Sequence, residues 1–134
     1  DNFLRYVDSG FYAGVVFHRV VEDFVIQAGG FTVDMEEKLT GKSIPNEAGE
    51  DRPNIRGAIS MARGQNPNSA TSQFFINLAD NAALDTDEYQ DGYCVFGEVF
   101  SGMEVADAIG GVQVMSVGSR ENVPLDPVVI SGAA

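Results

Sequence analysis

The sequence contains little from which a disulfide, a metal site or a membrane span could be built. It has one cysteine, Cys94, and one histidine, His18, among 134 residues. A single cysteine excludes an intrachain disulfide, and we expect an inert buried thiol because Cys94 lies in a strand-like run. No Cys/His spacing typical of a metal site is present, so we expect no metal and no cofactor. No apolar run approaches the roughly 18 residues that a membrane-spanning helix needs, and no signal peptide is visible.

Basic residues are also scarce, with 8 Lys and Arg against 20 Asp and Glu, which gives a net charge of −12. Such a charge repels phosphate backbones, so we expect no nucleic-acid partner. The lack of a long apolar run adds the expectation of no membrane partner. The acidic surface is either simply solvated or suited to a salty habitat. Hydrophobic residues make up 44% of the chain, which indicates a globular protein with one domain over residues 1–134. We expect a cytoplasmic location, with the periplasm as the alternative.

Short apolar runs between polar loops predict a mainly β chain. Strands are expected at Val15–Arg19, Phe24–Ala28, Ala58–Met61, Gln73–Leu78, Cys94–Val99, Val112–Val117 and Val128–Ile130. Helices are expected at Asn2–Val7, with Gly10 placed to cap it, and over residues 103–109, ended by two glycines. Residues 32–53 form a polar surface excursion. Many short strands with two helices suggest a closed or nearly closed antiparallel β-barrel.

Arg19 is the most informative residue, because it lies between two runs of β-branched and aromatic residues. Strand alternation predicts that Val15, Phe17 and Arg19 share one face. A charge on an apolar face is expensive to bury without a partner, and Gln27 on the next strand cannot neutralise it. Arg19 is therefore either free to donate hydrogen bonds into an apolar pocket or paired with a carboxylate, such as those at positions 22 and 23.

Five motifs follow one another along the chain. They are Phe-His-Arg-Val-Val (17–21), Phe-Val-Ile-Gln (24–27), Ser-Met-Ala (60–62), Ser-Gln-Phe-Phe-Ile (72–76) and Val-Phe-Gly (95–97). This ordered set closely resembles the cyclophilins, the cyclosporin-type peptidyl-prolyl isomerases, and its variants look bacterial. The resemblance covers essentially the whole chain. It implies an eight-stranded barrel capped by two helices, and an isomerase that accelerates X–Pro rotation in peptides and folding proteins without a cofactor.

The chain departs from the family pattern at its start. Cyclophilins carry a β-hairpin before the first helix, whereas this chain begins inside that helix at Asp1. We therefore expect the first two strands to be absent, which would leave open barrel edges able to pair with another chain as a homodimer. Either the sequence is a fragment, or a partner supplies the strands, or the barrel closes differently.

The resemblance also assigns site residues. Arg19 matches the catalytic arginine. The positions that match the pocket for the proline ring are Phe24, Val25, Phe75, Leu84 and Tyr93, although each alone could be ordinary core. Gln27 and Gln73 match polar groups that hold the substrate backbone and orient the arginine, or else they satisfy loop backbone. Backbone groups at Ala62 and Arg63 match those that pair with the residues before proline.

Two further positions bear on activity and inhibition. His18 should point to the strand face opposite Arg19 and at most line the rim, and twisting an amide transfers no proton, so it needs no acid–base role. Ala83 stands where eukaryotic cyclophilins carry a tryptophan that contacts cyclosporin, which predicts weak cyclosporin binding.

The alternative function is a non-catalytic chaperone or adaptor module that binds proline peptides without turnover.

Overall fold

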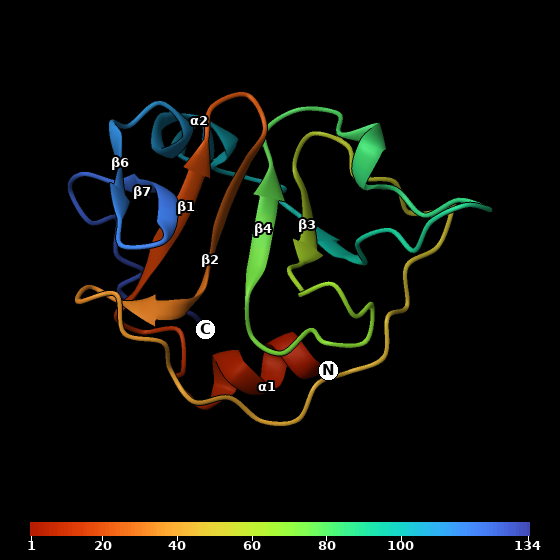
Figure 1. The fold of residues 1–134 in the computed structure, drawn as a ribbon, viewed down its shortest axis with the longest axis horizontal. Helices are drawn as coiled ribbons and strands as arrows, with labels where there is room; N and C mark the ends of the chain where they lie inside the picture. The colour runs from red at the N-terminus through yellow and green to blue at the C-terminus, as the bar shows by residue number, and fades with distance from the viewer.

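A computed structural model describes residues 1–134 (Figure 1). The helices are α1 (Asn2–Asp8), α2 (Met103–Gly110) and the 3-10 helix η1 (Ala82–Leu84). The strands are β1 (Val15–Val21), β2 (Val25–Thr32), β3 (Ala58–Met61), β4 (Phe74–Asn77), β5 (Val95–Glu98), β6 (Val114–Val117) and β7 (Arg120–Pro124). Strands β1 to β5 form an antiparallel sheet in the order β1-β2-β4-β3-β5, and β6 and β7 form a separate hairpin beside β1.

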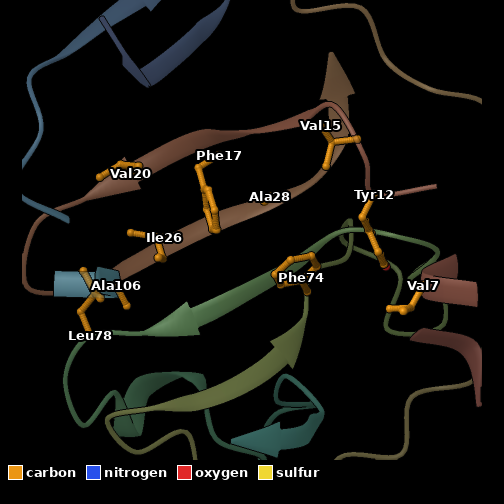
Figure 2. Packing of buried hydrophobic residues seen from close by; sticks show 10 residues of the cluster. All are labelled: Val7, Tyr12, Val15, Phe17, Val20, Ile26, Ala28, Phe74, Leu78 and Ala106. Carbon is orange, nitrogen blue, oxygen red and sulfur yellow. The ribbon is translucent and has the colours of Figure 1, made fainter. Parts of the chain in front are cut away.

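The main core lies where the two helices cover opposite ends of the large sheet (Figure 2). Its ten buried residues are Val7, Tyr12, Val15, Phe17, Val20, Ile26, Ala28, Phe74, Leu78 and Ala106. The α1 end packs aromatic rings, with Tyr12 edge-on to Phe74 at 5.4 Å between ring centroids. At the α2 end, Ala106 lies beside Leu78 and Ile26. Burial of these side chains supplies most of the driving force for folding.

Most predicted elements are confirmed with small changes in their ends. The strand at Ala58–Met61 has the predicted bounds, and the first helix ends one residue later than predicted, at Asp8. Gly10 follows that helix with φ +74°, and its N–H donates to the Val7 carbonyl at 3.0 Å. The left-handed backbone that this cap requires favours glycine, as the sequence predicted.

The end of the sheet was predicted wrongly. Residues 128–130 do pair with β1, through the bridge between Val16 and Val129 and the bond from the Ile130 N–H to the Val15 carbonyl at 2.8 Å, but the pairing is limited to this one bridge and does not extend into a strand. The strand that was missed is β7, whose residues Arg-Glu-Asn-Val-Pro include several with low strand propensity. Pairing with β6 through Met115 and Val123 overrides that propensity.

The predicted closed or nearly closed barrel is also wrong for these residues. The outer edge of β5 has no strand partner, and no strand joins β5 to the β6–β7 hairpin. A barrel requires every strand to pair on both sides, so the large sheet stays open. The prediction that the family's first two strands are absent is not supported by the described residues.

A register shift in β1 reverses the faces that simple alternation predicts. Phe17 pairs with Ala28, but Arg19, two residues on, pairs with Gln27, only one residue back. This extra residue on β1 shifts the alternation of its side chains, so that residues after it point to the face opposite to the one expected. Phe17 and Val20 therefore share the core face, and the prediction that Arg19 lies with Val15 and Phe17 is wrong.

Candidate active site

A second apolar cluster lies on the face of the sheet away from the main core. Its buried members are Val25, Ala62 and Phe75, and the half-buried side chains of Phe24, Leu84 and Tyr93 pack against them. These residues come from β2 and the residue before it, the residue after β3, β4, η1 and the segment before β5, so chain positions nearly 70 residues apart meet here. Phe75 and Tyr93 lie edge to face, with ring centroids 5.6 Å apart. All five residues predicted to hold a proline ring belong to this cluster.

Arg19 lies at the edge of this cluster. It pairs across the strands with Gln27, which pairs with Phe75, and residues that pair directly share a sheet face. The Arg19 guanidinium carbon lies 6.0 Å from the centroid of the Phe24 ring. The ion pairs of the chain are Arg52–Asp51 and Arg56–Asp107, so Arg19 has no carboxylate partner. The alternative interpretation, in which a neighbouring carboxylate pairs with Arg19, is therefore wrong.

The two glutamines contact each other rather than loop backbone. The Gln27 Nε2 donates to Gln73 Oε1 at 2.9 Å, across neighbouring strands. An amide nitrogen has two donors and an amide oxygen has two acceptor positions, so this bond uses only one donor of Gln27 and one acceptor position of Gln73. The other donors and acceptor positions of the two side chains remain free beside Arg19. Both side chains are half-buried and line one polar cavity with Arg19.

Ala62 and Arg63 form the opposite border of the cluster. The Ala62 N–H donates to the Gln73 carbonyl at 3.0 Å, so it is already engaged within the sheet. The Arg63 guanidinium carbon lies 4.4 Å from the centroid of the Tyr93 ring, and the side chain donates to the Asp91 carbonyl at 2.7 Å. Arg63 thus fixes Tyr93 and the loop before it, a contact that the sequence did not indicate.

A buried polar network supports the cluster from behind, and sequence reasoning missed it. Asn54 is 1% exposed, and its Nδ2 donates to the carbonyls of Leu84 and Tyr93 at 3.1 and 3.3 Å. Its Oδ1 accepts bonds from Ser60 Oγ at 2.6 Å and Asn77 Nδ2 at 3.2 Å. The signal available in the sequence was Asn77, a polar residue between apolar neighbours at the end of a strand.

His18 is buried, at 3% exposure, and its ring centroid lies 4.6 Å from that of Phe31. It lines the same polar cavity as Arg19, so the prediction that the two point to opposite faces is wrong. The register shift after Phe17 accounts for this. Burial, together with the positive charges of Arg120 and Arg19, lowers the pKa of His18 to about 4. The imidazole is therefore neutral at pH 7.

This shifted pKa predicts a pH-dependent stability. Between its ordinary pKa of 6.5 and about 4, His18 binds a proton in the unfolded chain but not in the folded one. The free energy of unfolding should fall as the pH decreases through this window, by up to roughly 3 kcal/mol. Urea unfolding at pH 7, 5.5 and 4 measures it, with His18→Gln as the non-titrating control. Equal pH slopes for the two proteins would rule out His18 as the cause.

The remaining features carry less chemistry. Cys94 is half-buried rather than buried, and its partial burial raises the pKa of its thiol. A separate apolar cavity of about 370 Å³ lies between α1 and β5, bordered by Phe3, Ile44 and Phe96. It lacks Arg19 and both glutamines. Neither α-helix has the length and apolar character needed to cross a bilayer.

Comparison with known proteins decides the family. The family model described as "Cyclophilin type peptidyl-prolyl cis-trans isomerase/CLD" matches residues 1–134. The chain belongs to the cyclophilin-type peptidyl-prolyl cis-trans isomerases. It is 54% identical over 132 residues to peptidyl-prolyl cis-trans isomerase A of Dickeya dadantii, covering 98% of this chain and 70% of that protein. It is 48% identical over 132 residues to isomerase B of Escherichia coli, covering 96% and 80%.

Solved structures agree with this family. A cyclophilin type peptidyl-prolyl cis-trans isomerase of Cryptosporidium parvum, determined in the presence of the dipeptide Ala-Pro, superimposes with a TM-score of 0.77 at 26% identity. The match covers 98% of this chain and 80% of that one. The cyclophilin-type chain described here is accordingly an isomerase that accelerates rotation about X–Pro bonds.

Proposed function

We propose that Arg19 stabilises the twisted X–Pro amide while the second apolar cluster holds the proline ring. Rotation about the amide faces a barrier of about 18–20 kcal/mol, and no bond needs to break. In the twisted state the prolyl nitrogen becomes pyramidal, and its lone pair, no longer delocalised into the carbonyl, can accept a hydrogen bond. A guanidinium that donates to this nitrogen stabilises the twisted state more than either planar form. Arginine suits the role because it stays charged and presents several fixed donors.

The surroundings of Arg19 support this assignment most strongly. Arg19 borders the apolar cluster, its guanidinium has no carboxylate partner, and Gln27 lies directly across the strand pair. An arginine paired with a carboxylate would stabilise the amide nitrogen less, because the negative charge would cancel part of the electrostatic effect of the guanidinium. The bonded pair of Gln27 and Gln73 supplies amide groups for the substrate backbone beside it.

The apolar cluster and its border are assigned the remaining contacts with the substrate. The ring of proline is assigned to Phe24, Val25, Phe75, Leu84 and Tyr93. Residues before proline are assigned to the border formed by Ala62 and Arg63. Because the Ala62 N–H is engaged by Gln73, the Ala62 carbonyl is left to accept from the substrate backbone.

The partners that follow are proline-containing peptides and unfolded proteins, acted on by one isomerase domain over residues 1–134. The Ala-Pro dipeptide named with the Cryptosporidium structure is consistent with such a site. Weak cyclosporin binding belongs to the same proposal, since Ala83 is exposed beside the cluster and offers only a methyl group. The proposal also includes a homodimer that pairs through the open sheet edges. Measuring the mass of the protein in solution tests this part.

The position of the site can be tested without measuring catalysis. A short Ala-Pro peptide is titrated into isotope-labelled protein, and the backbone amide shifts are followed. We expect the largest changes near Val25, Phe75 and Tyr93. Changes concentrated instead around Phe3 and Phe96, at the cavity between α1 and β5, would contradict the assignment.

A further inference from the structure

A polar cavity of about 380 Å³ adjoins the proposed site on the side of the β6–β7 hairpin, which lies beside β1 in Figure 1. No apolar residue lines it. Arg19, Gln27 and Gln73 form the wall that it shares with the proposed site. The hairpin forms the other wall, through Ser119 in its turn and residues 120–122 at the start of β7. The cavity is therefore continuous with the site but differs from the apolar cluster in chemistry.

The charge of this cavity is opposite to that of the chain as a whole. Arg19 and Arg120 both line it, and neither takes part in an ion pair. Glu121 is the one carboxylate among the lining residues, so two positive charges face one negative charge. The chain has only 8 basic residues and a net charge of −12, and two of those basic residues line this cavity.

Arg120 is held in place by an aromatic ring. Its guanidinium carbon lies 4.1 Å from the centroid of Phe31, which is 2% exposed. A guanidinium over a ring face is attracted by the π-electrons, and its donors at the edge stay free for a planar anion. The ring of His18 also packs on Phe31. His18 is 3% exposed, and its Nδ1 lacks a hydrogen-bond partner.

The sheet order indicates which part of a substrate would reach this cavity. Ala62 and Arg63 follow β3, whereas Arg19 lies on β1, and β4 and β2 separate these strands. If the residues before proline lie along Ala62, as the proposed function has it, the residues after proline lead toward β1 and the hairpin. A carboxylate in that part of the substrate would meet Arg120, with Arg19 and the buried His18 beside it.

We propose that this cavity is a subsite for an acidic side chain one or two residues after the proline, with Arg120 as its specificity-determining residue. The inference rests on the proposed function, because that function sets the direction of the peptide. Aspartate and glutamate fit the subsite because a carboxylate can accept two bonds from one guanidinium. A charged hydrogen bond of this kind corresponds to about a tenfold preference.

Exchange NMR on four capped peptides tests the inference. Ala-Pro-Glu-Ala is compared with Ala-Pro-Gln-Ala, and Ala-Pro-Ala-Glu with Ala-Pro-Ala-Gln. In one of these pairs the native protein should show a kcat/KM about tenfold higher for the acidic peptide, and added salt should reduce the ratio. In Arg120→Gln the ratio should fall to about one. Circular dichroism confirms that the variant, changed at an exposed hairpin residue, is folded.

The matched control is Arg52→Gln, which removes the same charge from an exposed arginine whose ion pair lies elsewhere. It should keep the tenfold ratio. A ratio near one in the native protein would overturn the subsite and leave the proposed function intact, as would an equal loss in Arg52→Gln. No acceleration of any of the four peptides by the native protein would instead overturn the proposed function, and the subsite with it.

Discussion

Replacing Arg19 by alanine should lower kcat/KM for an Ala-Pro peptide by about 10²–10³-fold, the usual cost of removing one donor that stabilises a transition state. The loss should fall mainly on kcat. The guanidinium interacts with the prolyl nitrogen only when the amide is twisted, whereas the apolar cluster binds the ring in every state. Rates of cis–trans isomerisation at several peptide concentrations separate the two constants.

Arg19→Lys is the matched variant for this change, because it keeps the charge but not the planar set of donors. We expect an intermediate rate, which would show that geometry and charge both contribute. Stability should change little in either variant, since Arg19 is only half-buried and makes no ion pair. An Arg19→Ala protein within about fivefold of the native kcat/KM would exclude Arg19 as the catalytic residue.

The second large effect is expected on stability, at Asn54. Truncation to alanine leaves the buried Ser60 Oγ without its acceptor, and it removes one of the two acceptors of Asn77 Nδ2, which keeps only the Ala58 carbonyl. It also removes the donor to the carbonyls of Leu84 and Tyr93. Each unsatisfied buried group costs about 1–3 kcal/mol, so we expect a loss of about 3 kcal/mol in the free energy of unfolding. Urea unfolding measures it.

The control for this change is Asn68→Ala, in an exposed loop where Asn68 Oδ1 accepts a single bond from the Asn46 N–H. Water can replace that bond, so the loss should stay below about 1 kcal/mol. Asn54→Ala should also weaken peptide binding, because the positions of Leu84 and Tyr93 depend on Asn54. Equal destabilisation by the two alanine variants would refute the role assigned to the buried network.

The sequence predicted the composition of the site better than its geometry. The ordered motifs brought Arg19, Gln27 and Phe75 together correctly, because they resemble a family in which these positions share one site, and the observed strand pairing places them on one face. Alternation failed at Arg19, since the register shift in β1 depends on pairing with β2 rather than on any property of the residues 17–19. The closed barrel was not found, because closure depends on every edge having a partner and not on the pattern within a strand.

Other parts of the site left no readable pattern. Asn54 follows a proline in an irregular segment, where a polar residue is ordinary, and only the fold shows that it is buried. The strand β7 contains Arg120, Glu121 and Asn122, which resemble a surface loop in composition. Its pairing with β6 and its place beside β1 bring Arg120 over Phe31, a contact between residues 89 positions apart that local sequence cannot specify.

The most direct test of catalysis by Arg19 is exchange NMR on a short Ala-Pro peptide, with protein at about one-hundredth of the peptide concentration and Arg19→Ala measured alongside. We predict faster cis–trans exchange with the native chain and a loss of that acceleration in the variant, although the variant still binds the peptide at the Phe75 cluster. Equal acceleration by both proteins would contradict the assignment of Arg19. Binding without acceleration by the native chain would indicate a non-catalytic module for proline peptides.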